Sequence, residues 1–175
     1  MYKIGQNVET IQKEIDIKLK KGQNYEALIY SVFCFERMVR RTIKFMLIRA
    51  GYHPKFIDNY IIGEHSEWSE LRGLFKLGNL YLGNSEEGIN DILTKPIWKI
   101  FDNGDPKKMG AMQIRNKIAH GFVPEEEIVQ SASQSMKKVI EKWDLWTSAN
   151  LKYNGTRKII YHRGKVKIPY PMKKV

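Results

Sequence analysis

One segment of this chain, from Asn24 to Ala50, contains neither glycine nor proline, and it constrains the fold more than any other feature. Gly51 follows it, as a glycine often follows the end of a helix. The side chains expected on its core-facing side recur at helical spacing; they are Leu28, Phe35, Met38, Thr42, Phe45 and Met46. We predict that this segment is the central helix of an all-α protein.

Further helical segments are predicted on both sides of this central helix. The first has apolar residues at helical spacing, begins after a cap at Asn7 and stops at Gly22. The others are expected at 54–62, at 66–80 with core residues Trp68, Leu71, Phe75 and Leu80, from 85 with an interruption at Pro96, at 106–120, and from Pro124 to Trp146 or slightly beyond. Residues 1–150 are therefore predicted to form one antiparallel helical bundle.

The last part of the chain differs from the rest in charge and in pattern. Of the net charge of +11, the first 150 residues contribute +3, because eight Lys or Arg and no Asp or Glu follow Asn150. Residues 158–162 and 165–168, which contain β-branched and aromatic residues, flank Arg163-Gly164, and this pattern predicts a short basic β-hairpin within a tail at 151–175. Tyrosines interleave with its basic residues, so the hairpin could bind a single strand or dock on the helical domain.

Cysteine and histidine usage limits the chemistry that the chain can perform. Cys34 is the only cysteine, which excludes an intramolecular disulfide and a cysteine zinc site and favours a reducing compartment. The other histidines, His53, His65 and His162, have no ligand-like spacing, so we expect no metal and no cofactor. The residues after Met1 lack a signal-peptide core, and we expect a cytoplasmic protein without a membrane span.

The segment that indicates chemistry is Ile114-Arg115-Asn116-Lys117-Ile118-Ala119-His120-Gly121-Phe122. Asn116 and His120 are four residues apart and share a helix face, whereas Arg115 lies about 140° away from His120 around the helix. The long arginine side chain could still reach the same place and bind a phosphate with two hydrogen bonds. These three residues therefore suit a phosphodiester.

Cleavage of RNA by its own 2′-hydroxyl needs a base, an acid and positive charge on the transition state. His120 is a candidate for either proton transfer, Arg115 for stabilising the charge, and Asn116 for orienting the phosphate or the 2′-hydroxyl. A structural alternative stands beside this interpretation. Histidine before glycine, with arginine or lysine nearby, is also an ordinary way to end a helix.

Residues 114–122 resemble the R-x4-6-H signature of HEPN domains, including a polar residue directly after the arginine. HEPN domains are small helical bundles with this motif close to the last long helix, and here it precedes the helix predicted from Pro124. The resemblance covers residues from about 23 to 146. It implies a metal-independent endoribonuclease site formed by Arg115 and His120, with Asn116 beside them, at a two-fold dimer interface.

The resemblance also implies partners and a setting. A homodimer would bring two copies of His120 together for the acid and base steps. Family members act on RNA as toxins or in phage defence, sometimes with an antitoxin or another regulatory partner. Some antitoxin-paired members carry a modified tyrosine two residues after the histidine, where this chain has Phe122. The alternative is a non-catalytic HEPN-like module that dimerises and binds RNA or a partner protein.

Other basic side chains are candidates for RNA binding. Arg37, Arg40, Arg41 and Lys44 form a stripe on the central helix, and Lys117 and Arg163 add to them. The stripe could follow a phosphate backbone or could be an ordinary solvated face. Glu36 lies beside the stripe and could instead pair with an arginine of the site.

Overall fold

The computed structural model describes residues 7–62, 67–82, 87–103 and 108–151, and the regular elements within these ranges are all helical. The predicted all-α class is confirmed for this part of the chain. The predicted hairpin lies outside the described residues. The described residues divide into two compact units, one formed by residues 7–38 with those from 93 to 151, and the other by those from 39 to 92.

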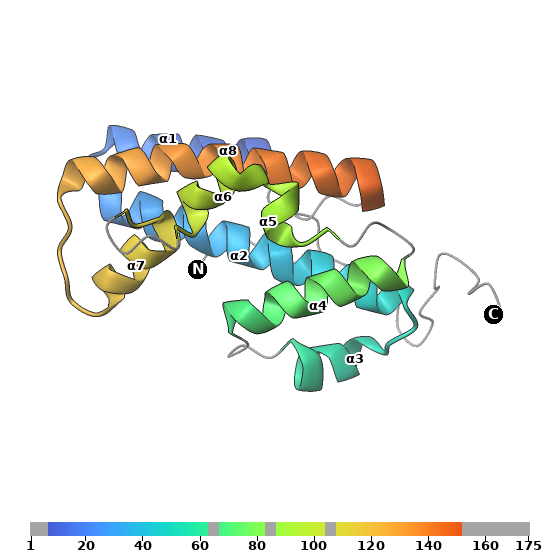
Figure 1. The fold of residues 1–175 in the computed structure, drawn as a ribbon. Coiled ribbons are helices and arrows are strands. Elements are labelled where there is room, and N and C mark those ends of the chain that lie inside the picture. The colour runs from blue at the N-terminus through green and yellow to red at the C-terminus, as the bar shows by residue number, and fades with distance from the viewer. Residues whose placement is uncertain (1–6, 63–66, 83–86, 104–107, 152–175) are drawn as a thin grey trace. The chain divides into compact units, whose positions relative to one another are not determined.

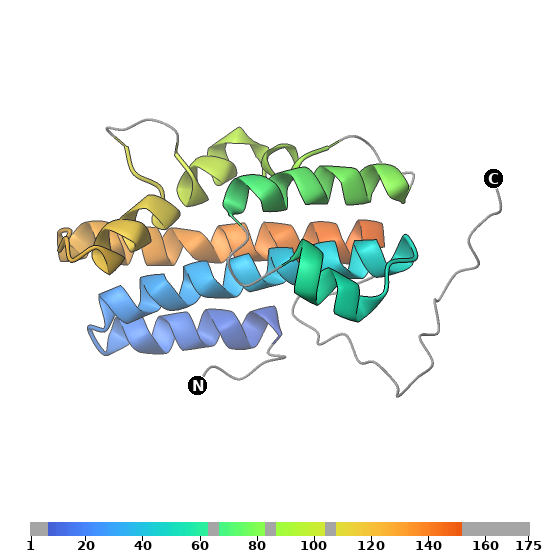
Figure 2. The same ribbon diagram turned by 90° about the horizontal axis from the view of Figure 1, so that it is seen from below.

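The described part of the first unit contains four complete helices and the first part of a fifth. They are α1 (Val8–Lys20), the beginning of α2 (Asn24–Arg49), α6 (Thr94–Phe101), α7 (Ala111–Ala119) and α8 (Glu126–Leu151). The helix α8 contacts α1, α6 and α7 along its length. The turn between α1 and α2 and the loop between α7 and α8 lie at the same end of this unit (Figure 1, Figure 2).

Local sequence signals explain where α1 and α8 begin. The side chain of Asn7 accepts a hydrogen bond from the Thr10 backbone N–H at 2.8 Å, which confirms the predicted cap of α1. The helix α8 begins at Glu126, so Pro124 precedes the helix instead of lying in its first turn. Glu126 and Glu127 occupy that turn, where carboxylates stabilise the positive end of the helix dipole.

Aromatic side chains form the centre of the first unit. Phe35 of α2 meets Phe101 of α6 edge to face, with ring centroids 4.7 Å apart, and meets Trp143 of α8 at 5.9 Å. All three side chains are fully buried. Edge-to-face pairs of this kind add to the stabilisation that burial provides, so they fix the position of α2 against α6 and α8. The residue after Phe35 is Glu36, whose carboxylate pairs with Arg115 of the candidate site described below.

The second unit includes the rest of α2 followed by short and medium helices. These are α3 (Pro54–Phe56), the π-helix η1 (Ile57–Ile61), α4 (Trp68–Tyr81) and α5 (Ile89–Ile92). Gly78 of α4 lies so close to α2 that an added Cβ would be 3.2 Å from the Cβ of Met46. Leu71 and Phe75 are buried as predicted, but Leu80 is 46% exposed.

The prediction for Leu80 was wrong because Leu80 lies outside the face that α4 buries along its whole length. Leu80 is five residues beyond Phe75, which puts it about 140° away around the helix. Gly78 and the hydrogen-bonded side chain of Asn79 occupy the buried positions instead. The amide of Asn79 donates to the Glu87 carbonyl oxygen at 2.9 Å, which satisfies its buried polar group.

The helical break near Pro96 lies before the proline. The helix α5 ends at Ile92, and α6 begins at Thr94, whose φ is +61°. Pro96 is the third residue of α6, within the first turn, where backbone N–H groups have no partner inside the helix. Proline is tolerated there, so the predicted interruption occurs as two helices. None of the described helices combines the length and the apolarity needed to cross a membrane.

Candidate functional site

The site helix α7 begins later than predicted because its first turn is fixed to the end of α6. The backbone N–H of Gly110 donates to Gln113 Oε1 at 3.0 Å, and Gln113 Nε2 donates to the Asp102 carboxylate. Gly110 is buried, and a Cβ at this position would lie 2.6 Å from the Phe101 carbonyl oxygen. Glycine is required at this close approach, so α7 starts at Ala111 rather than near residue 106.

The end of α7 is a Schellman motif that holds His120 at the capping position. The N–H of Phe122 donates to the Lys117 carbonyl oxygen at 2.9 Å, and the N–H of Gly121 donates to the Ile118 carbonyl oxygen at 3.0 Å. Gly121 has a φ of +83°, a conformation that other residues adopt at a cost. The sequence His120-Gly121 therefore determines where the helix stops and where the imidazole is attached.

Arg115 is bound to a carboxylate of the central helix. Its Nη2 lies 2.6 Å from Glu36 Oε1, and the two side chains are 30% and 24% exposed. This contact confirms the prediction that Glu36 could pair with an arginine of the site. A charge-assisted hydrogen bond between half-buried groups fixes the direction of the guanidinium plane. The other N–H groups of its fork are the kind of donors that bind a phosphate.

Asn116 and His120 are both exposed at the end of the same helix. The His120 backbone N–H donates to the Asn116 carbonyl oxygen at 3.1 Å, as expected for residues one turn apart. Lys117 is also exposed, and its Nζ lies 5.0 Å from the centre of the Phe122 ring. The helix thus presents an amide and an imidazole to solvent, whereas the arginine is directed to α2.

A tyrosine that the sequence did not single out fixes the loop after this site. The hydroxyl of Tyr25, in the first turns of α2, donates to the Pro124 carbonyl oxygen at 2.8 Å. The loop from Gly121 is therefore held at its start by the Schellman motif and near its end by Tyr25. Tyr25 and Pro124 are far apart in sequence, so no local pattern signals the contact. Gln113, by contrast, has the spacing of a capping box and could have been found.

The other basic candidates lie in different surroundings. Arg37, in the first unit, lies over the Phe33 ring at 5.3 Å. Lys44, in the second unit, pairs with the Asp58 carboxylate. The predicted stripe also includes Arg40 and Arg41, which are half-buried. Arg163 lies outside the described residues.

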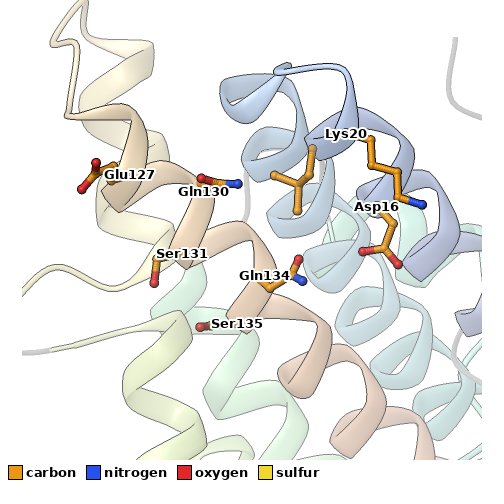
Figure 3. A pocket seen from close by; sticks show the side chains of 8 residues that line it. Asp16, Lys20, Glu127, Gln130, Ser131, Gln134 and Ser135 are labelled. Atoms are coloured by element: carbon orange, nitrogen blue, oxygen red, sulfur yellow. The ribbon is translucent and has the colours of Figure 1, made fainter.

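Surface grooves flank α8 in the described part of the first unit. One, of about 560 Å³, lies between α1 and α8, where Gln130 and Gln134 extend towards Asp16 and Lys20 (Figure 3). Another, of about 390 Å³, is lined by residues of α6, α7 and α8, among them Ile114. Asn116 and His120 line neither groove. The exposed polar residues at the end of α7 therefore form a separate surface feature.

No three His, Cys, Asp or Glu side chains gather as they would around a metal ion in the part of the chain that the structure describes. Comparison with known proteins finds no matching family model, no matching curated protein and no matching solved structure. The resemblance to HEPN domains consequently depends on residues 114–122 and on the helical surroundings of that segment.

Proposed function

We propose that this protein is a metal-independent endoribonuclease of HEPN type. The observation that supports this most is the arrangement at the end of α7. Exposed Asn116 and His120 lie one turn apart, and Arg115 on the same helix is held by a hydrogen-bonded carboxylate. This arrangement supplies a proton-transfer group, an amide and a cation on one short, well-anchored helix.

In the proposed reaction the 2′-oxygen of the RNA attacks the adjacent phosphorus, and the bond to the 5′-oxygen breaks. A base takes the 2′-hydroxyl proton, and an acid gives a proton to the departing 5′-oxygen. The products are a 2′,3′-cyclic phosphate and a 5′-hydroxyl. His120 is assigned one of the proton transfers, Arg115 the charge on the phosphorane, and Asn116 the orientation of the phosphate.

The acid and base steps call for two groups, and each chain carries one histidine in this motif. An isologous homodimer would place a second His120 near the first, so the proposal includes a composite site. Phe122 and Val123 are 53% and 75% exposed beside His120, which is compatible with an apolar contact between copies. A toxin or phage-defence role, with or without an antitoxin, follows from the family resemblance.

A second candidate function is a HEPN-like module that dimerises and binds RNA or a partner protein without cleaving it. The contact between Arg115 and Glu36 favours this alternative, because it already occupies part of the guanidinium. A carboxylate so close to the arginine also reduces the positive charge offered to a phosphate. The exposed Phe122 and Val123 suit a binding surface equally well.

The experiment that tests the proposal compares wild type with His120→Ala on a structured RNA and on a tRNA pool, with EDTA present. We expect cleavage by the wild type and a loss on the order of 10²–10⁴-fold in the variant, the range that a proton-transfer group contributes. His53→Asn is the matched control, because His53 lies outside the site and asparagine retains its capping of α3.

Product ends and binding distinguish the two candidate functions. A 2′,3′-cyclic phosphate formed by wild type and by His53→Asn, but not by His120→Ala, supports transesterification through His120. Full activity of His120→Ala would rule out the assigned role. If neither the wild type nor His120→Ala cleaves the RNA, but both bind it equally, the binding module is the better description.

A further inference from the structure

Three aromatic side chains of the second unit form a row, which we call the aromatic ladder: Tyr52, Phe56 and Tyr60. The rings of Tyr52 and Phe56 are nearly parallel, at 10°, with centroids 6.4 Å apart, and Phe56 is 5.3 Å from Tyr60. Phe56 is 46% exposed and Tyr60 is 77% exposed. Single exposed aromatic residues are ordinary, but a contiguous row of them marks an interaction surface.

The backbone under the ladder is anchored, so the exposure of the rings does not come from an unpacked segment. Pro54 and Ile57 are buried, and the His53 ring accepts a hydrogen bond from the Lys55 N–H at 3.2 Å. Tyr60 lies in the π-helix η1, a rare element that is frequent at functional sites.

A hydrogen bond links the ladder to α4. The Tyr52 side chain is hydrogen-bonded to that of Tyr81, which is itself 57% exposed, and this bond raises the pKa of Tyr52. The first ring of the ladder is therefore held from two sides, by Phe56 and by Tyr81. Four aromatic side chains thus contribute to one partly exposed surface.

The segment that carries the ladder is positively charged. Residues 39–62 contain five Lys or Arg and one acidic residue, Asp58, which gives a net charge of +4. Asp58 is paired with Lys44, so its negative charge is neutralised locally. Arg49 precedes Tyr52 by three residues, and exposed Lys55 is adjacent to Phe56. Flat rings and cations on one segment fit a partner that carries flat bases and regular negative charges.

We propose that the aromatic ladder is a binding site for a single-stranded nucleic acid, whose unpaired bases stack on Tyr60 and the neighbouring rings. Exposed Lys55, adjacent to Phe56, contacts the phosphates. An anionic lipid surface could also bind tyrosine rings and cations, so it is an outcome that the test distinguishes. This site goes beyond the proposed ribonuclease and does not depend on cleavage at His120.

The test uses the full-length chain and a fluorescein-labelled oligouridine with 2′-O-methyl riboses, which cannot be cleaved by 2′-oxygen attack. Anisotropy measures the dissociation constants of wild type, Tyr60→Phe and Tyr60→Leu. We expect Tyr60→Phe to bind like wild type, because phenylalanine keeps the flat ring. Leucine keeps apolar bulk without that ring, so Tyr60→Leu should bind roughly 5- to 150-fold more weakly, the range for losing one stacked base.

Controls distinguish base stacking from a general loss of apolar surface. Leu145→Ala alters a different exposed apolar residue, 61% exposed on α8, and should leave binding unchanged. A duplex of the same length should be insensitive to Tyr60→Leu, because its bases are already stacked. Binding is also measured with a thymidine oligonucleotide, which should behave like the uridine one because stacking does not require a 2′-hydroxyl.

Three results would overturn the ladder proposal. The first is equal affinity of Tyr60→Leu and Tyr60→Phe for the oligouridine. The second is a change in oligomeric state on Tyr60→Leu with binding unaffected, which would assign the ladder to contacts between copies. The third concerns phosphatidylserine vesicles, whose binding is measured with the same variants: Tyr60→Leu weakens binding to the vesicles but not to the oligouridine. Each leaves the His120→Ala cleavage result untouched, so the two proposals fail separately.

Discussion

The two ends of α7 differ in what fixes their structure, although the helix contains only nine residues. At its beginning Gly110 and Ala111 are buried, and the Phe101 carbonyl leaves no space for a side chain. At its end Asn116 and His120 are exposed, and backbone hydrogen bonds of the Schellman motif define the geometry. Packing therefore positions the first turn of α7, whereas local backbone hydrogen bonds position the last turn. Polar side chains in the last turn can consequently change without disturbing the core.

The most destabilising change predicted from this comparison is Gly110→Ala. The new Cβ would lie 2.6 Å from a backbone oxygen, which cannot move as the end of a flexible side chain could. We expect the free energy of unfolding to fall by about 1–3 kcal/mol, the usual cost of overpacking. Urea denaturation followed by circular dichroism measures the change.

Gly73→Ala is the matched control for Gly110→Ala. Gly73 lies within α4, and a Cβ there would meet no atom within 4 Å. Alanine in an exposed helix interior should stabilise the protein by roughly 0.5–1 kcal/mol. If both substitutions had the same effect, the close packing assigned to the beginning of α7 would be wrong.

Gly121→Ala tests the other end of the helix. No atom lies within 4 Å of the position that its Cβ would take, so the expected cost is that of the left-handed backbone, at φ +83°. We expect a loss of about 1 kcal/mol on urea denaturation. Cleavage should fall as well if His120 is catalytic, because the capping position moves.

Gly121→Asn refines this test, because asparagine tolerates the left-handed region better than alanine does. It should retain more stability and more cleavage than Gly121→Ala. A stability that is the same for glycine, alanine and asparagine would mean that the Schellman motif does not determine the end of α7.

The weakest effect is predicted for the ion pair between α2 and α7. A double-mutant cycle with Glu36→Gln and Arg115→Gln should give a coupling energy on the order of 0.5 kcal/mol, as for other partly exposed pairs. High salt should reduce the coupling. A coupling of zero at low salt would show that Glu36 does not hold Arg115 in solution.

The same pair of substitutions bears on catalysis. If Glu36 positions the guanidinium, Glu36→Gln should reduce cleavage less than Arg115→Gln does, since glutamine can still accept a hydrogen bond. If Glu36 instead weakens the charge on Arg115, Glu36→Gln should increase cleavage. The direction of this change thus shows what the carboxylate does for the site.

Much of the helical architecture was predictable because its signals are local. The cap at Asn7 and the helix ends before Gly22 and Gly51 depend on residues within one or two turns. Glu36 was a candidate partner for an arginine of the site, but Glu36 and Arg115 are 79 residues apart, so no local signal specified this contact. The start of α7 was misplaced because Phe101 and Gly110 meet only after the chain folds.

Sequence alone was enough to define the helical class, the candidate residues Arg115, Asn116 and His120, and the end of their helix at Gly121. These features depend on periodicity and on the backbone preferences of single residues. The folded chain was needed to learn that Arg115 contacts Glu36 while His120 is exposed to solvent, and that Tyr25 holds the following loop. Such contacts join residues that are distant in the chain, and their approach depends on packing rather than on local preference.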